Sequence, residues 1–295
     1  MNFTKRFTLL GLLLAALSVT AAEPATLTHV HGLSYSADGT RILVPSHHGI
    51  AVYQNGRWTK AEGPAHDYMG YSATADALYS SGHPAPGSGL TNPFGLIKSS
   101  DGGKSWKKLG LEGESDFHVL ATGYGTNTVY VINHSKNSRM DRPGIFHTGS
   151  DGLKWTRAAA KGLNAEPKNL AAHPRDPATV AAGTADGLYL SRDAAESFER
   201  LFAGPVIAAF FELDGQTLWF SSYADKASLM RLALKTGARP ESVPIPSLTD
   251  DAVAYIAQNP KRRDEFAIAT FKRDVFVSKD AGRTWEAIAL KGEPA

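Results

Sequence analysis

Hydrophobic and polar residues alternate over short runs along most of the chain, a pattern typical of half-buried β-strands. Clear examples are the runs 128–132, 217–220 and 266–269. Glycine and proline separate these runs, and no long segment has the period of an amphipathic helix. In the first such unit, strands are expected near residues 31–35, 41–45, 49–53 and 57–60. The pattern therefore predicts an all-β protein.

A motif of the form S-x-D-x-G-x-T-W recurs along the chain. Full matches end at Trp106 and Trp285, degenerate copies end at Trp155 and Phe198, and a trace of the motif ends at Trp58. In chain order these aromatic residues are separated by 48, 49, 43 and 87 residues, so one repeat has lost its motif. Six units of about 45 residues, each long enough for one four-stranded blade, predict a six-bladed β-propeller.

The motif itself has a structural explanation. It suits a tight turn between the third and fourth strands of a blade, where the aspartate accepts hydrogen bonds from turn amides and the tryptophan packs between blades. The aspartates that we therefore regard as structural and not catalytic are Asp101, Asp151, Asp193 and Asp280. We expect Trp106 and Trp285 to be buried between blades, away from the functional face.

The N-terminus has the features of a signal peptide. Lys5 and Arg6 precede an apolar run at 7–17, and small residues follow at 20–22. We expect a signal peptide over residues 1–22, a single propeller domain over 23–295, and a periplasmic or secreted protein. The alternative is an uncleaved anchor, although the run is short for a membrane span, and no second apolar run predicts a span after cleavage. The segment before His29 is a candidate for a closing strand.

Composition excludes several classes of function. The chain has no cysteine, which rules out disulfides, thiolate catalysis, a lipidated cysteine and a cysteine-ligated metal. Its 31 Lys and Arg residues nearly balance 29 Asp and Glu residues, so no strong field favours a phosphate backbone and nucleic acid is not an expected partner.

Histidine is the most informative residue type in this chain. In a propeller, the starts of first strands and the ends of second strands lie on the same face. Eight of the ten histidines fall at such positions, and all eight belong to the first three units: His29, His31, His47, His48, His66, His83, His118 and His134. His147 and His173 fall elsewhere, and we expect ordinary structural roles for them.

Neutral imidazole is a common ligand for transition metals, so these histidines predict a site for a metal ion or a metal-bearing ligand. The ligands expected to come together are His31, His48, His66, His83 and His118, with Asp67 beside them. Whether His29, His47 and His134 join the site is left open. Copper is favoured by the order of metal affinities and zinc comes next. Structural packing of the histidines and a catalytic role are the alternatives.

Several motifs resemble those of a known group of exported proteins. They are the segments 29–33, 47–49, 66–71, 81–84, 95–103 and 116–118. With them the chain resembles the Asp-box (BNR) repeat propellers called the F510_1955 family of bacterial glycosylhydrolase-like proteins, and more loosely the sialidase-like and sortilin-like proteins. This resemblance implies a propeller and an exported location, but no particular reaction, because fold does not imply function.

A sialidase would need three arginines around a carboxylate, and no arginine starts a first strand here; Arg139 and Arg142 share one loop. An ordinary glycosidase would need two opposed carboxylates, for which Asp67, Asp116 and Asp250 are available. Two hypotheses remain: a non-enzymatic metal-binding propeller, and a glycoside hydrolase acting through carboxylates and histidines on the same face. Peptide binding in the channel, as in sortilins, has no specific residue in its favour.

Overall fold

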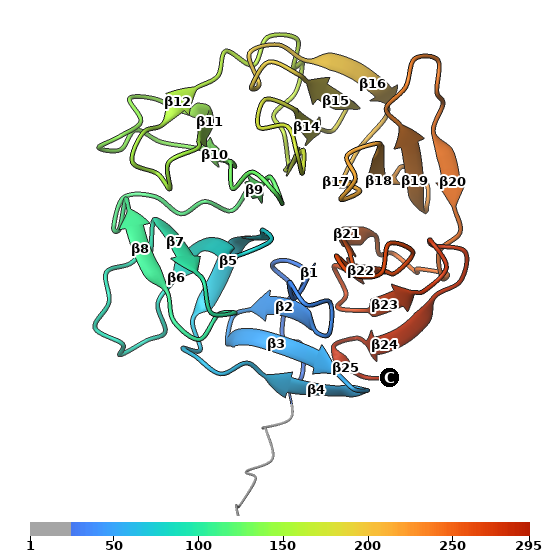
Figure 1. The fold of residues 1–295 in the computed structure, drawn as a ribbon, viewed down its shortest axis with the longest axis horizontal. Helices are drawn as coiled ribbons and strands as arrows, with labels where there is room; N and C mark the ends of the chain where they lie inside the picture. Colours follow the sequence, from blue (N-terminus) through green and yellow to red (C-terminus); the bar gives the residue numbers. More distant parts are fainter. Residues whose placement is uncertain (1–24) are drawn as a thin grey trace, which may run out of the picture.

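The protein is a ring of six antiparallel β-sheets, each a four-stranded meander in chain order, and the sixth sheet has a fifth strand. Figure 1 shows the sheets as blades around a central axis in this computed structural model, which describes residues 25–295. The predicted six-bladed propeller is confirmed, whereas the predicted signal peptide lies outside the described residues. No part of residues 25–295 forms a helix that could cross a membrane.

Blades one to three follow one another directly along the chain. Blade one consists of β1 (Ser34–Tyr35), β2 (Ile42–Ser46), β3 (Gly49–Gln54) and β4 (Arg57–Lys60). Blade two consists of β5 (Asp67–Ala73), β6 (Leu78–His83), β7 (Leu96–Ser99) and β8 (Lys107–Gly110). Blade three consists of β9 (Leu120–Thr122), β10 (Val129–Asn133), β11 (Gly144–Thr148) and β12 (Thr156–Arg157).

Blades four to six complete the ring. Blade four consists of β13 (Asn169–Ala172), β14 (Val180–Gly183), β15 (Gly187–Ser191) and β16 (Glu199–Ala203). Blade five consists of β17 (Ala208–Phe211), β18 (Thr217–Tyr223), β19 (Ala227–Ala233) and β20 (Glu241–Val243). Blade six consists of β21 (Val253–Gln258), β22 (Phe266–Thr270), β23 (Val275–Ser278), β24 (Glu286–Leu290) and β25 (Glu293–Pro294).

The ring closes where blade one meets blade six. The segment before His29 was a candidate for the closing strand, but the described residues before β1 form no strand. Instead the C-terminal β25 pairs with β24, and the amide of Leu27 donates a hydrogen bond of 2.8 Å to the carbonyl oxygen of Gly292. The two ends of the described chain are therefore joined at the same blade junction.

The hydrophobic core is divided into six clusters, and each cluster lies between two neighbouring blades. Strand residues of alternating parity supply them, since successive side chains point to opposite faces of a sheet. Each blade therefore buries both of its faces, and the position of each inner strand is fixed by packing against the next blade.

The S-x-D-x-G motif forms the same turn in blades two, four and six, between the third and fourth strands. In blade six, Ser278 Oγ donates to Asp280 Oδ1, while the amide of Thr284 donates to that same carboxylate oxygen at 2.9 Å. Asp101 and Asp193 accept equivalent bonds. These hydrogen bonds lower the pKa of each aspartate to about 2. The structural interpretation of these aspartates explains every contact they make here.

We expected the motif tryptophans Trp106 and Trp285 to be buried, and the extent of burial was overestimated. Trp106 and Trp285 are only half-buried, although each packs against an inter-blade cluster as predicted. Trp106 stacks on Tyr68, and the indole of Trp285 donates to the carbonyl oxygen of Pro244. Both rings lie near the outer strands, where one edge remains open to solvent. By contrast, Trp219, which is not part of the motif, is fully buried.

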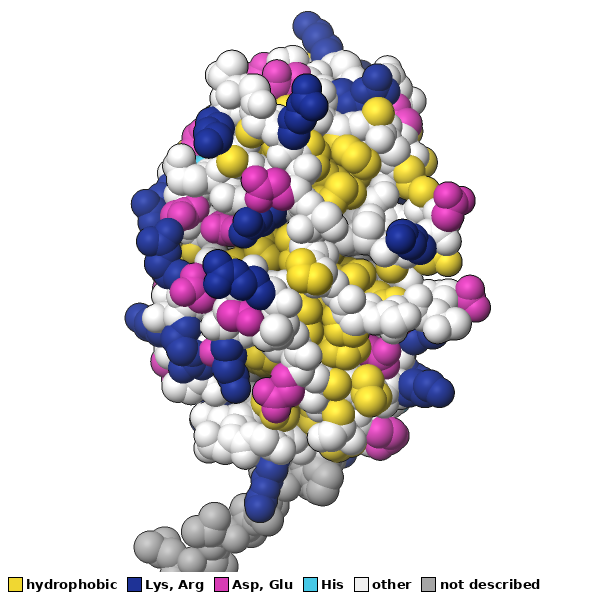
Figure 2. Space-filling view, turned by 90° about the vertical axis from the view of Figure 1, so that its right-hand side faces the viewer, with side chains coloured by type: hydrophobic (Ala, Val, Ile, Leu, Met, Phe, Trp, Pro, Cys, Tyr) yellow, Lys and Arg dark blue, Asp and Glu magenta, His cyan; other side chains and the backbone are white. Residues whose placement is uncertain are grey.

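The inner strands of all six blades line a narrow central channel with a volume of about 160 Å³. Its walls are mostly small or apolar side chains such as Ala171, Ala208 and Phe211. Figure 2 shows the side of the molecule that includes blades five and six: charged groups of both signs are scattered there beside apolar patches, and histidine is almost absent. Histidine is thus concentrated elsewhere, on the first three blades.

Candidate metal centre

The histidines lie where the propeller topology places them, at the starts of first strands and the ends of second strands. His29 and His31 precede β1, and His47 follows β2. Asp67 begins β5, His83 ends β6, and His118 precedes β9. These side chains come from distant parts of the sequence, and the structure arranges them in two groups rather than one.

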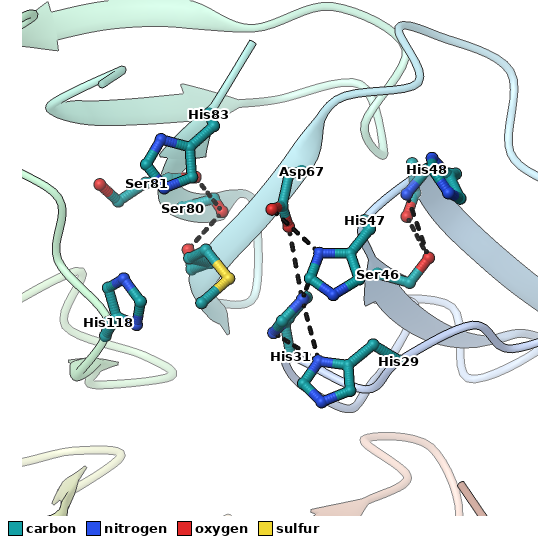
Figure 3. Close-up of polar contacts among 12 residues, drawn as sticks. His29, His31, Ser46, His47, His48, Asp67, Ser80, Ser81, His83 and His118 are labelled. Carbon is teal, nitrogen blue, oxygen red and sulfur yellow. Dashed lines mark hydrogen bonds and ion pairs between the residues drawn. The ribbon is translucent and has the colours of Figure 1, made fainter. Parts of the chain in front are cut away.

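The first group consists of His29, His31 and His47, with Asp67 in contact with two of them (Figure 3). His31 Nε2 lies 3.2 Å from His29 Nδ1 and 3.3 Å from His47 Nδ1. Asp67 Oδ2 lies 3.0 Å from His47 Nδ1, and Asp67 Oδ1 lies 3.4 Å from His31 Nε2. His31 Nε2 therefore lies within 3.4 Å of one nitrogen of each neighbouring histidine and of the Asp67 carboxylate.

Local geometry explains this convergence. His29 and His31 are two residues apart in an extended segment, so their side chains lie on the same side. The amide of His31 donates to the carbonyl oxygen of Pro45, which holds this segment against the strand that ends just before His47. The rings of His29 and His47 then stack with their centroids 5.0 Å apart.

The environment of two members of this group, His29 and His31, disfavours their protonated forms. Burial, with a further contribution from the neighbouring His29, lowers the pKa of His31 to about 4. Burial and the nearby His47 also lower the pKa of His29. Near neutral pH, His31 is therefore a neutral imidazole, the protonation state that a metal ligand needs.

The second group consists of His83, Asp116 and His118. Asp116 Oδ2 lies 2.6 Å from His118 Nε2 and 3.1 Å from His83 Nε2. The other ring nitrogen of His83, Nδ1, lies 2.7 Å from the side-chain oxygen of Asn92. All three side chains of the group are partly open to solvent.

The two groups are neighbours on blade two. Asp67 of the first group is the direct cross-strand partner of His83 of the second, so the two side chains lie on the same face of the sheet. Gly82, with φ of +105°, permits this arrangement: a Cβ there would lie 2.1 Å from the carbonyl oxygen of Asp67. Glycine at this position lets the ends of β5 and β6 approach closely.

Two of the predicted ligands are not part of either group. His66 is buried, packs against the ring of Phe94 and accepts a hydrogen bond at Nδ1 from the amide of Ala85. It points away from the groups because adjacent residues of an extended chain face opposite sides. His48 is exposed, and Figure 3 shows it beyond Ser46, turned away from the first group. The turn after β2 directs His47 inward instead.

The remaining histidines have other contacts. His134 lies 3.6 Å from Glu166 Oε1, outside both groups. His147 stacks on Tyr130, and His173 Nε2 donates to the carbonyl oxygen of Gly215. The latter two thus have the structural contacts that the sequence predicts for them.

Sequence reasoning left His29 and His47 open and did not place Asp116 among the ligands. A signal for His29 and for Asp116 was present in the sequence. The spacing of His29 and His31, and of Asp116 and His118, is two residues, which puts both members of each pair on one side of an extended chain. Asn92 has no comparable signal, because it lies in a loop whose path the sequence does not define.

Two of the three carboxylates that a glycosidase could use are otherwise engaged, whereas the third, Asp250, is exposed. Asp67 and Asp116 each contact two imidazoles. Arg139 donates to backbone carbonyl oxygens, including that of Leu109, and Arg142 pairs with Asp141. These arginines form no carboxylate clamp in this arrangement.

No family model matches the sequence, and no curated protein matches it. Among solved structures, the chain is similar to a GH74 enzyme of Niastella koreensis, with a TM-score of 0.60 and 15% identity over 90% of this chain and 46% of that one. A GH74 xyloglucanase of Xanthomonas campestris gives a TM-score of 0.57 and 14% identity over 92% and 46%. The chain therefore spans about half the length of these enzymes.

A further similar structure is YCF48 bound to D1 peptide, with a TM-score of 0.52 and 16% identity over 92% of this chain and 85% of that one. At such identities the likeness shows the fold alone. Glycoside hydrolases and a peptide-bound protein share it, so the fold does not choose a function. The chain is thus a six-bladed β-propeller with two groups of histidine and aspartate that could hold metal ions.

Proposed function

We propose that this propeller is an exported, non-enzymatic protein that binds a transition-metal ion through His29, His31, His47 and Asp67. The proposal that the protein is exported rests on the N-terminal sequence pattern described above. The metal site rests on the geometry of the first group.

The observation that carries the proposal is the spacing of the ligand atoms. An ion with tetrahedral bonds of about 2.0–2.1 Å holds its ligand atoms roughly 3.3–3.4 Å apart. The contacts of His31 Nε2 with His29 Nδ1, His47 Nδ1 and Asp67 Oδ1 measure 3.2, 3.3 and 3.4 Å. These three contacts, all made by His31 Nε2, match three of the six edges of a tetrahedral site.

The electrostatics of the group also favour a cation. Asp67 Oδ1 is buried and accepts no hydrogen bond, a costly condition for a carboxylate oxygen. A metal ion would supply the missing positive partner. His31 is already neutral near pH 7, so binding there would displace no proton from it.

Copper and zinc are the ions that the ligands favour. The affinity order of divalent ions favours copper at nitrogen ligands, whereas the tetrahedral spacing suits zinc, which has no geometric preference of its own. Direct titration with each ion decides between them.

A binding role is favoured over glycoside hydrolysis because two of the three rim carboxylates, Asp67 and Asp116, already contact imidazoles. Asp67 and Asp116 contact imidazoles, whereas a glycosidase needs one carboxyl group as an acid and an opposed carboxylate as a base or nucleophile. The same protein can be assayed with a panel of aryl glycosides. Hydrolysis that persists in chelator would support the enzymatic alternative.

The test is a metal titration of the untagged protein after removal of metal by a chelator. The variant His47→Gln changes a half-exposed ligand and leaves the core intact, and His48→Gln is the matched control one residue away. We expect His47→Gln to lower the number of tightly bound ions per chain by one and His48→Gln to leave it unchanged. Equal binding by wild type and His47→Gln, or no binding by wild type, would overturn the proposal.

A further inference from the structure

We propose that the second group, His83, Asp116 and His118, binds a second divalent transition-metal ion, and that Asn92 orients His83 for this role. The site is separate from the first and stands on its own contacts. The two sites share the face of blade two but no ligand.

The first observation is the hydrogen bond between His83 and Asn92. An amide oxygen only accepts hydrogen bonds, so the 2.7 Å contact with Asn92 Oδ1 places a proton on His83 Nδ1. In the neutral ring, Nε2 then carries a lone pair. Metal-binding histidines are commonly fixed in this way, by a partner that takes the N–H of the other ring nitrogen.

That lone pair faces another acceptor. His83 Nε2 lies 3.1 Å from Asp116 Oδ2, and an ionised carboxylate oxygen also carries only lone pairs. With a neutral His83, two such atoms repel each other, and a cation bound between them would relieve the repulsion. His118 Nε2 lies 2.6 Å from the same oxygen, a hydrogen-bond distance, so His118 would move outward slightly when the three ligand atoms bind one ion.

A second feature points to a missing cation. Asp116 Oδ1 is buried and has no hydrogen-bond partner, like Asp67 Oδ1 in the first group. Within residues 25–295, only six buried polar side-chain atoms lack a partner, and two of them belong to these aspartates. Each candidate site thus contains one buried carboxylate oxygen without a hydrogen-bond partner.

The chemistry of the second site differs from that of the first. Two imidazoles and one carboxylate provide three ligands and leave coordination positions for water or another small ligand, an arrangement that iron(II), zinc and copper accept. The first site has four ligands, and one of them, His31, is only 6% exposed, whereas the second site has three ligands and its two histidines are 40% and 54% exposed. The second ion should therefore bind more weakly and exchange faster than the first.

The neighbouring sites should also affect each other. Asp67 and His83 are cross-strand partners, so the two cations would be close enough to repel. Occupation of the first site should weaken binding at the second, and added salt should reduce this effect if solvent separates the ions.

The experiment counts ions. Metal-free, untagged protein is dialysed against zinc or cobalt(II), and bound metal per chain is measured by elemental analysis. Wild type should bind two ions, His118→Gln one and the His47→Gln/His118→Gln double variant none. His134→Gln is the control, since His134 is also exposed and has a single carboxylate neighbour outside both groups.

The role of Asn92 has its own measurement. Asn92→Ala should weaken the second site by about 10–100-fold, the usual effect of losing such a partner, and leave the first site unchanged. Asn92→Asp keeps an acceptor and should restore the affinity. An equal loss in both variants would mean that Asn92 acts only by shaping its loop.

The two proposals fail in different ways. If wild type binds one ion, which His47→Gln removes and His118→Gln does not, the second site is refuted and the first stands. If the single ion is lost in His118→Gln and kept in His47→Gln, the first site is refuted and the second stands. Binding of two ions by His118→Gln would also refute the second site.

Discussion

The burial of His31 predicts that the metal-free protein loses stability in acid. The pKa of this imidazole is about 4 in the folded protein, against 6.5 in an unfolded chain, mainly because burial disfavours the charged ring. Between these pH values the unfolded state binds more protons than the folded state, so the free energy of unfolding falls as the pH falls. The contribution of His31 to the free energy of unfolding is therefore complete above pH 6.5, and it is lost as the pH approaches 4.

The magnitude follows from the difference between the two pKa values. A tenfold change in proton affinity corresponds to about 1.4 kcal/mol, so the full loss is about 3 kcal/mol. The charged or titratable groups that influence His31 are His29, His47, Asp67 and His118. Of these, only Asp67 opposes the shift, because its negative charge favours the protonated ring.

The assay is urea denaturation of chelator-treated protein at several pH values between 7.5 and 4, with wild type compared with His31→Asn. Wild type should lose about 3 kcal/mol more than the variant over this range. His134→Asn changes an exposed histidine on the same face and should keep the wild-type pH dependence. Identical pH dependence of wild type and His31→Asn would refute the reasoning.

Three further predictions concern packing and are tested by thermal or chemical denaturation. Gly70→Ala should lower the free energy of unfolding by at least about 1–3 kcal/mol, because φ is +52° and a Cβ would lie 1.8 Å from the carbonyl oxygen of Phe117. Since Phe117 stands between Asp116 and His118 in the sequence, the variant should also weaken the second metal site. Unchanged stability and metal binding would contradict this prediction. Trp219→Ala should cost about 3–5 kcal/mol and Trp285→Ala clearly less, since only Trp219 is fully buried; the reverse order would be inconsistent with the burial. Ser221→Ala should cost about 1–3 kcal/mol, because the buried hydroxyl donates to the carbonyl oxygen of Val253 across the junction of blades five and six; a neutral effect would show that this bond does not contribute to the junction.

Much of the fold could be predicted because its determinants are local. The alternation in runs such as 128–132 specifies strands, and the spacing of the motif aromatics specifies a blade length. The motif turn is closed by its own residues, as the bonds between Ser278, Asp280 and Thr284 show. Burial of Trp106 was overestimated, because the exposure of a ring near the outer strand depends on the neighbouring blade.

The candidate site was predictable only in outline. The order of strands in a meander places first-strand starts and second-strand ends on one face, which correctly brought Asp67 to His31 and His83 to His118. Sequence could not choose between His47 and His48, because a turn can direct either residue inward.

The sequence by itself therefore determined the propeller, its approximate blade length and the concentration of histidine on three blades, since these follow from periodicity and chain connectivity. Only the tertiary structure divided the histidines into two groups, turned His66 into the core, and added Asp116 and Asn92 to the second group. Those outcomes depend on the directions of side chains at strand ends and on the close approach of β5 and β6. Both are set by contacts between segments that are distant in the sequence, and such contacts leave no periodic pattern along the chain.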